Sequence, residues 1–136
     1  MALDPAALIG TWRLVSCESR NAAGEVRYPY GERPAGYLTY TPDGFMFGTL
    51  SARDRRPFAS DGPIRGTPDE WATAGREYLA YCGRYSVHGD TVIHHVELSL
   101  FPNWIGGDQQ RFVRLDGDRL AISTATSTTL VWERAT

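Results

Sequence analysis

Residues 82–100 read CGRYSVHGDTVIHHVELSL and carry the clearest strand pattern in the chain. Apolar and polar side chains alternate on both sides of Gly89-Asp90, as they do in two antiparallel strands joined by a tight turn. In the register that this turn implies, Tyr85 lies opposite His94, while the neighbouring His95 points to the other, more polar face. The more apolar face consists of Gly83, Tyr85, Val87, Val92, His94, Val96, Leu98 and Leu100. The stretch therefore predicts a β-hairpin with one histidine on its apolar face.

Further short strands, separated by turn signals, extend from this hairpin in both directions. Strands are predicted over residues 10–18, 36–41, 45–50 and 128–133 and on both sides of Asp116-Gly117-Asp118, while a short segment at 26–28 is left open. These make about eight strands in meander order. Because closure removes exposed strand edges, we predict a mainly β protein: one domain over residues 1–136, folded as a closed up-and-down antiparallel β-barrel.

One segment interrupts the strands. Thr67 is a good helix N-cap, Pro68 suits the first turn, and Asp69 and Glu70 complement the positive end of a helix. The pattern predicts one inserted α-helix over about residues 68–81. Such a helix either closes one mouth of the barrel, with the preceding loop as a lid, or covers an open end or a sheet face.

The other hairpins also separate into two faces. Between residues 36 and 50, one set holds Leu38, Tyr40, Phe45 and Phe47, and the other holds Tyr37, Thr39 and Met46. The first set is the better candidate for the interior. At the Asp116-Gly117 turn, Val113, Leu115, Leu120 and Ile122 share one face, and Arg111 lies on that same face.

Arg111 is notable because a charge among inward aliphatic side chains is costly unless it is paired. One interpretation is that its guanidinium meets a carboxylate, phenolate or carbonyl oxygen of a ligand. The other is that Arg111 pairs with an internal acid such as Glu18, or extends to water at the barrel rim.

Aromatic and histidine side chains supply the remaining candidate site residues. Tyr40, Phe47 and Tyr85 are predicted walls of a cavity, and Trp104 either contacts a ligand at the mouth or plugs the barrel. His94 is either a hydrogen-bonded core residue or a ligand contact. It is also the side chain type that exchanges protons near neutral pH, so a catalytic role for His94 with Tyr85 and Arg111 stays open.

Composition excludes several classes of function. The net charge of −2 argues against a nucleic-acid binder, and no lysine is present for Schiff-base chemistry. No signal peptide or membrane span is visible, which makes a cytoplasmic protein the default expectation, and Cys17 and Cys82 are expected to be reduced. His94 and His95 point to opposite faces and cannot chelate one ion, so neither a metal site nor a cofactor is predicted.

An ordered series of motifs resembles a bacterial and fungal lipocalin-like domain family with a calycin-type barrel. The motifs are Gly10-Thr-Trp12, residues 36–44, 82–87, 94–97 and 102–106, Gln110-Arg111 and residues 117–120. The resemblance covers nearly the whole chain and implies a barrel with an internal cavity. It also implies that Trp12 packs at the closed end beneath an arginine of the last strand, a role that Arg134 matches.

These observations lead to three hypotheses of function. The first is binding of a small hydrophobic or aromatic molecule in the barrel interior. The second, which the resemblance keeps open, is a cofactor-free isomerase, cyclase or dehydratase acting on a polyketide- or terpene-like substrate. There His94 would move a proton and Arg111 would stabilise an enolate or alkoxide oxygen. The third is a barrel used for protein contact, with a homodimer as one form.

Overall fold

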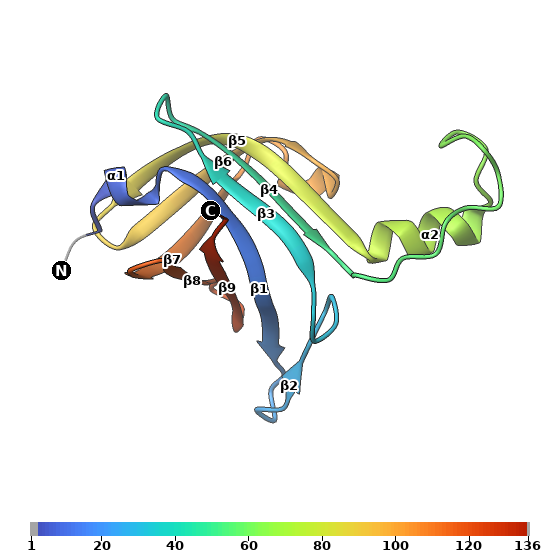
Figure 1. Cartoon of the computed structure of the whole chain (residues 1–136), viewed down its shortest axis with the longest axis horizontal. Helices are drawn as coiled ribbons and strands as arrows, with labels where there is room; N and C mark the ends of the chain where they lie inside the picture. The colour runs from blue at the N-terminus through green and yellow to red at the C-terminus, as the bar shows by residue number, and fades with distance from the viewer. Residues whose placement is uncertain (1–2, 136) are drawn as a thin grey trace.

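A computed structural model describes residues 3–135, and β-strands account for most of it (Figure 1). The elements, in chain order, are α1 (Pro5–Leu8), β1 (Gly10–Arg20), β2 (Val26–Arg27), β3 (Ala35–Tyr40), β4 (Phe45–Ser51), α2 (Pro68–Arg76), β5 (Tyr78–His88), β6 (Thr91–Ser99), the 3-10 turn η1 (Pro102–Trp104), β7 (Asp108–Asp116), β8 (Arg119–Ser123) and β9 (Thr128–Arg134).

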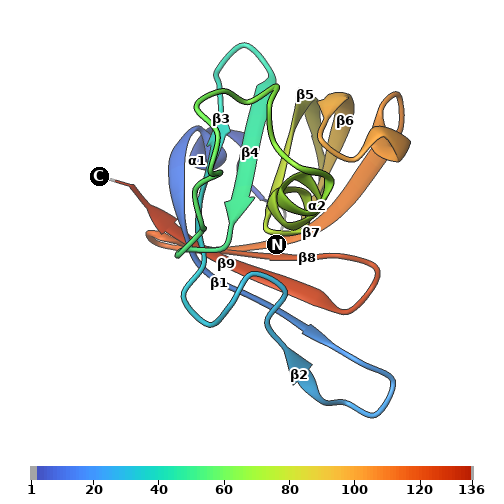
Figure 2. The same ribbon diagram turned by 90° about the vertical axis from the view of Figure 1, so that its right-hand side faces the viewer.

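The strands form one closed antiparallel sheet. From β3 to β9 each strand pairs with the next in the chain, β3 pairs back with β1, and β9 pairs with β1 to complete the circle. The short β2 is an additional strand that extends from the end of β1 (Figure 2). The predicted up-and-down barrel of eight strands is therefore confirmed.

Two of the three hairpins place their side chains on the faces that the sequence pattern predicts, although the last turn is Gly117-Asp118 and not Asp116-Gly117. Tyr85 pairs with His94 across the Gly89-Asp90 turn, and Leu115 pairs with Leu120 across the Gly117-Asp118 turn. Both turns contain two residues, and each has a glycine with positive φ, which a tight hairpin turn between twisted strands requires.

The register of the β3–β4 hairpin differs from the prediction, and this moves Phe47 to the outer face. Tyr40 pairs with Met46, because the loop holds three residues and ends on Gly44 at φ 92°. The additional residue exchanges the two faces of β4. Met46 is consequently buried, whereas Phe47 is 51% exposed. The predicted inward placement of Phe45 and Phe47 is wrong.

A second irregularity changes the open end of the barrel. A register shift lies next to Cys82 and Gly83, so that Gly83 pairs with Val96 while Cys82 pairs with Leu98. A bulge of this kind turns the following side chains to the opposite face. Leu98 is therefore exposed instead of buried.

Helix α2 begins where the sequence predicted and ends earlier. Thr67 and Glu70 form a reciprocal capping box at its N-terminus. The helix stops at Arg76 instead of residue 81, because residues 78–81 pair as a strand with β4. Local helix propensity gives way there to sheet pairing.

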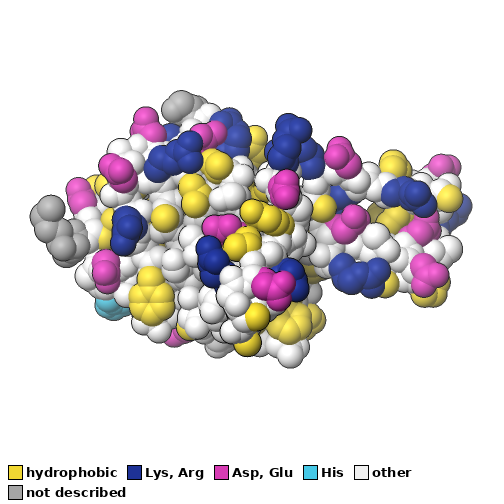
Figure 3. Space-filling view, turned by 90° about the horizontal axis from the view of Figure 1, so that it is seen from below, with side chains coloured by type: hydrophobic (Ala, Val, Ile, Leu, Met, Phe, Trp, Pro, Cys, Tyr) yellow, Lys and Arg dark blue, Asp and Glu magenta, His cyan; other side chains and the backbone are white. Residues whose placement is uncertain are grey.

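The inserted segment does not act as the expected cover. α2 and its preceding loop project away from the barrel beyond the ends of β4 and β5 (Figure 1), and no residue from 52 to 76 lines the interior cavity. The segment is held together by its own contacts, including an edge-to-face pair of Phe58 and Trp71 with ring centroids 5.1 Å apart. Figure 3 shows this extension with arginine and acidic side chains interspersed, as they are over the rest of that face.

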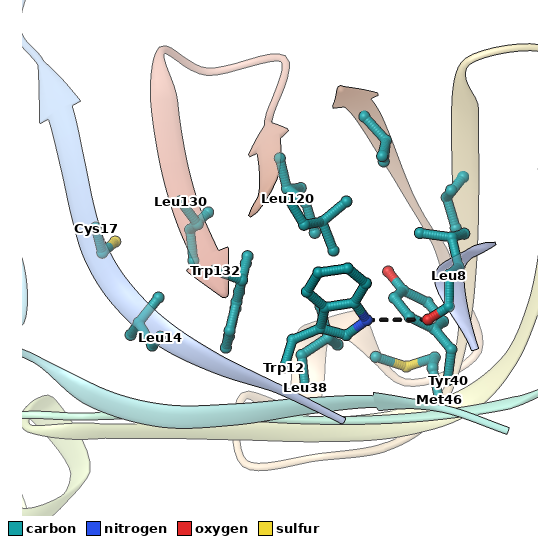
Figure 4. Packing of buried hydrophobic residues seen from close by; sticks show 13 residues of the cluster. Leu8, Trp12, Leu14, Cys17, Leu38, Tyr40, Met46, Leu120, Leu130 and Trp132 are labelled. Carbon is teal, nitrogen blue, oxygen red and sulfur yellow. Dashed lines mark hydrogen bonds between the residues drawn. The ribbon is translucent and has the colours of Figure 1, made fainter. Parts of the chain in front are cut away.

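The closed end of the barrel is built around Trp12, which is fully buried. Its indole Nε1 donates to the Leu8 carbonyl at 2.9 Å (Figure 4). The guanidinium of Arg134 lies 4.0 Å from the centroid of the indole ring, and it donates to the carbonyls of Ala7 and Ile9. The packing of Trp12 beneath Arg134, which the family resemblance implied, is confirmed.

Candidate ligand-binding site

The barrel encloses a cavity of about 510 Å³. It occupies the half of the barrel opposite Trp12, and its mouth lies among loop residues that include Tyr30, Trp104 and Thr126. This volume is in the range of pockets that hold small organic molecules. The walls come from nearly every strand of the barrel: Cys17, Leu38, Met46, Gly48, Leu50, Leu79, Tyr81, His94, Gln109, Arg111, Ile122, Leu130 and Trp132.

Most of this wall is aliphatic or aromatic, and its principal polar feature is a row of three side chains from β3, β5 and β6. His94 is 2% exposed, and both of its ring nitrogens are engaged. Tyr40 Oη lies 2.7 Å from Nε2, and Tyr81 Oη lies 2.6 Å from Nδ1. Tyr81 lines the cavity, whereas Tyr40 lies behind His94 and is fully buried.

Burial keeps all three members of this row uncharged at neutral pH. Desolvation lowers the pKa of His94 to about 3, and the positive charge of Arg111 adds to that decrease. Burial also raises the pKa of Tyr40 and of Tyr81, and Arg111 opposes the increase at both hydroxyls. The row is therefore a neutral hydrogen-bonded unit beside one permanent positive charge.

Arg111 supplies that charge on the cavity wall, as the sequence predicted. Its Nη2 donates to Gln109 Oε1 at 3.1 Å, and its Nη1 donates to the Gln110 carbonyl at 3.1 Å. Among the residues that the structure describes, no carboxylate forms an ion pair with Arg111, so the predicted alternative of a Glu18 partner has no support. The guanidinium is thus available to an oxygen atom of a ligand.

The structure brings three of the six predicted site residues to the cavity: His94, Arg111 and Trp104 line it. Tyr40 supports His94 from behind. Tyr85 points toward the closed end, where its hydroxyl donates to the Thr41 carbonyl at 2.9 Å, so the predicted role of Tyr85 beside a substrate is not supported.

Phe47 stands apart from the other predicted site residues because it lies on the outer face, away from the cavity. At the mouth, Trp104 packs edge-to-face on Tyr81 with ring centroids 5.5 Å apart. It is therefore a rim residue that also holds Tyr81 in place.

Tyr81 is the site residue that sequence reasoning missed. It falls inside the predicted helix, although Leu79, Tyr81, Gly83 and Tyr85 continue the alternation of the following strand. That alternation was the available signal. Cys17 also faces the cavity, and burial raises the pKa of its thiol to about 11, which removes the thiolate form that nucleophilic chemistry needs.

The outer face carries a second polar row. Ser86 Oγ lies 3.0 Å from His95 Nε2, and His95 Nδ1 lies 2.8 Å from Asp108 Oδ1. The order of groups is that of a serine-hydrolase triad, but Ser86 Oγ also bonds His88. Asp108 reaches the cavity lining, whereas Ser86 and His95 do not. Among residues 3–135, no three potential ligand side chains are grouped to hold a metal ion, and neither helix is long and apolar enough to cross a membrane.

Acidification is expected to destabilise the fold through His94. The folded protein keeps His94 neutral down to about pH 3, whereas an unfolded histidine has an ordinary pKa of 6.5. The unfolded state therefore binds the additional proton between these values, so stability is lost as pH falls from about 6.5 to 3, by about 1.4 kcal/mol per pH unit. Above about pH 6.5 this contribution is constant.

Urea unfolding midpoints of the wild type and His94→Gln, measured at about pH 7 and pH 5, check this expectation. The wild type should lose stability on acidification by a larger amount than the variant, because glutamine does not titrate. An equal loss in both proteins would contradict the assignment.

The closed eight-stranded barrel, the tryptophan–arginine pair at its closed end and the interior cavity define a lipocalin-like protein. A family described as a lipocalin-like domain matches residues 9–136, and the chain belongs to that family.

One fungal relative and two solved structures are similar to the chain. The chain is 48% identical over 69 residues to the 4'-hydroxy-3'-methoxypropiophenone carrier protein ppsC of Aspergillus oryzae, and the match covers 45% of this chain and 62% of that relative. A lipocalin-like protein from Bacteroides uniformis has a similar structure, with a TM-score of 0.53, 13% identity and coverage of 93% of this chain and 97% of that chain. An uncharacterized protein from Bacteroides eggerthii gives a TM-score of 0.51 and 14% identity, with coverage of 93% and 98%. At these identities the two structures support the fold alone.

Proposed function

We propose that the protein binds a small aromatic molecule in its barrel cavity and serves as its carrier, with a single-ring phenol or aryl ketone as the ligand class. The observation that carries the proposal is the cavity itself: about 510 Å³ of mostly apolar space with Tyr81 and Arg111 on its wall. Apolar walls stabilise a ring by removing it from water, while a few polar groups fix its orientation.

The fungal relative supports the same ligand class. Its name describes a carrier of a hydroxylated and methoxylated aryl ketone. Such a molecule combines an apolar ring with oxygen atoms that accept hydrogen bonds, and the cavity offers apolar walls together with the donors Arg111 and Tyr81.

The geometry favours binding over the isomerase or cyclase hypothesis. A general base must hold a free lone pair near the proton it removes and must have a pKa near the working pH. In His94 both ring nitrogens are hydrogen-bonded to tyrosines, and burial lowers its pKa to about 3. His94 is therefore a weak base, and its place in the wall suits ligand positioning better than proton transfer.

A titration of intrinsic fluorescence with 4'-hydroxy-3'-methoxypropiophenone tests the proposal. Trp104 and Trp132 line the cavity, so we expect saturable quenching by a bound ring. Native mass spectrometry should show one ligand per chain, and the same spectra test the predicted homodimer. Failure of this ketone and of simple phenols to bind would overturn the proposal.

Removing the charge of Arg111 is expected to weaken binding. Arg111→Met keeps much of the side-chain length but removes the guanidinium, so affinity for the ketone should fall about tenfold or more, as expected for the loss of a hydrogen bond from a charged donor. Arg114→Met is the matched control, because Arg114 lies on the exposed face of the same strand. An equal affinity in the two variants would show that Arg111 does not contact the ligand.

A further inference from the structure

We infer that the cavity selects a ligand oxygen that accepts hydrogen bonds, such as a carbonyl or phenolate oxygen, and that the buried Tyr40 imposes this choice through His94. The inference rests on the proposed function and specifies the chemistry of its ligand. It makes Tyr81 a hydrogen-bond donor to the ligand and Tyr40 a positioning residue that never touches it.

The Tyr40 hydroxyl determines which group donates and which accepts in each hydrogen bond of this row. Its side chain is fully buried, and among residues 3–135 its hydroxyl has one hydrogen-bond partner, His94 Nε2, at 2.7 Å. A buried hydroxyl proton without an acceptor is costly. Tyr40 therefore donates its proton to Nε2, and Nε2 carries none of its own.

The protonation of Nε2 in the neutral imidazole determines the protonation of Nδ1. A neutral histidine has one protonated ring nitrogen, so an accepting Nε2 places the proton on Nδ1. Burial disfavours the doubly protonated form, since the pKa of His94 is lowered to about 3. Nδ1 then donates to Tyr81 Oη at 2.6 Å.

Tyr81 is the end of the row and faces the cavity. Its oxygen accepts from His94, so its own proton is free to be donated elsewhere. Within the described part of the chain no other side-chain or backbone acceptor bonds Tyr81 Oη, so the acceptor must come from the cavity contents. Arg111, on the same wall, adds a second donor that has no acceptor role.

The two hydrogen-bond donors, Tyr81 and Arg111, determine which chemical group of a ligand can bind beside them. A carbonyl oxygen has two lone pairs and can accept from both Tyr81 and Arg111, and a phenolate oxygen can do the same with its charge stabilised by the guanidinium. A hydrocarbon of the same shape leaves both donors without a partner. The site should therefore distinguish propiophenone from propylbenzene, which has the same carbon skeleton but no oxygen.

The first test uses the ligand-free wild type. Proton–nitrogen NMR correlations of the His94 ring distinguish its protonated nitrogen from its unprotonated one. We expect protonated Nδ1 and unprotonated Nε2. In Tyr40→Phe, which retains the ring, the preference should weaken to a mixture of tautomers, while Tyr85→Phe should leave it unchanged because the Tyr85 hydroxyl bonds the Thr41 carbonyl. Protonated Nε2 in the wild type would overturn the inference without affecting the proposed function.

The second test compares affinities for propiophenone and propylbenzene by fluorescence titration. The wild type should prefer the ketone by about tenfold or more, and Tyr81→Phe with intact Arg111 should lose most of that preference. Tyr40→Phe should reduce the preference several-fold without changing the affinity for propylbenzene.

Separate outcomes identify which proposal fails. Equal affinity of the wild type for both molecules would overturn the inference and leave apolar binding intact. A preference that survives in Tyr40→Phe would remove Tyr40 from the scheme. Absence of binding by either molecule would overturn the proposed function and the ligand choice together.

Discussion

Replacing Trp12 by alanine is expected to lower the free energy of unfolding by about 3–5 kcal/mol, the usual cost of truncating a fully buried aromatic side chain. Trp12 is 0% exposed and closes one end of the barrel. Its loss also leaves the Leu8 carbonyl without the indole donor and removes the ring on which Arg134 stacks. Because small proteins are stable by only about 5–15 kcal/mol, a large part of the folded population should be lost.

Urea denaturation followed by circular dichroism measures the effect, and Trp71→Ala is the matched control. Trp71 is 47% exposed and lies on the projecting α2, so its loss should change the barrel midpoint little. The milder Trp12→Phe, which keeps a ring but loses the bond to Leu8, should fall between the two. Equal midpoints for Trp12→Ala and Trp71→Ala would contradict the role of Trp12 as the closing residue.

Filling the cavity from Gly48 is expected to abolish ligand binding while leaving the fold intact. Gly48 lines the cavity, and a Cβ built on it meets only Leu38 Cδ1 at 3.5 Å and Met46 Cε at 3.6 Å, which are ordinary contacts. In Gly48→Phe the phenyl ring therefore enters the cavity, and affinity for an aryl ketone should fall at least about 100-fold. Stability should be kept or raised, because glycine weakens a strand and phenylalanine favours one.

The control for this variant is Phe47→Leu, one residue away on the outer face of β4. It should bind the ketone like the wild type. Binding that survives in Gly48→Phe would show that the ligand lies outside the cavity. Loss of binding in Phe47→Leu would indicate that Phe47 faces the cavity, as the sequence pattern predicted.

The fold could be predicted wherever local chemistry determined the strand register. The turns at Gly89-Asp90 and Gly117-Asp118 hold two residues, so alternation alone placed Tyr85 opposite His94 and aligned the β7–β8 pair. The β3–β4 loop holds three residues, and the left-handed conformation of Gly44 that completes it depends on the backbone path. The third loop residue, which the prediction did not include, was enough to move Phe47 from the inner face of the barrel to the outer face.

The site was predictable in part for a related reason. His94 and Arg111 lie on strands whose alternation is clear, and both reach the cavity. Tyr81 lies where helical and strand signals overlap, and its pairing with Gly48 is a long-range contact that no local pattern contains. The hydrogen-bonded row also needs residues 40, 81 and 94 to meet in space, which follows only from barrel closure.

The seam between β1 and β9 has a consequence for the order of events during synthesis. It pairs residues 12–19 with residues 128–134, so the two strands of the seam leave the ribosome far apart in time. Until β9 emerges, β1 has an unpaired edge and Trp12 lacks its stacking partner. Closure must therefore wait for β9 and has a high loop-entropy cost, and a nascent chain stalled before residue 128 would expose two sheet edges to aggregation.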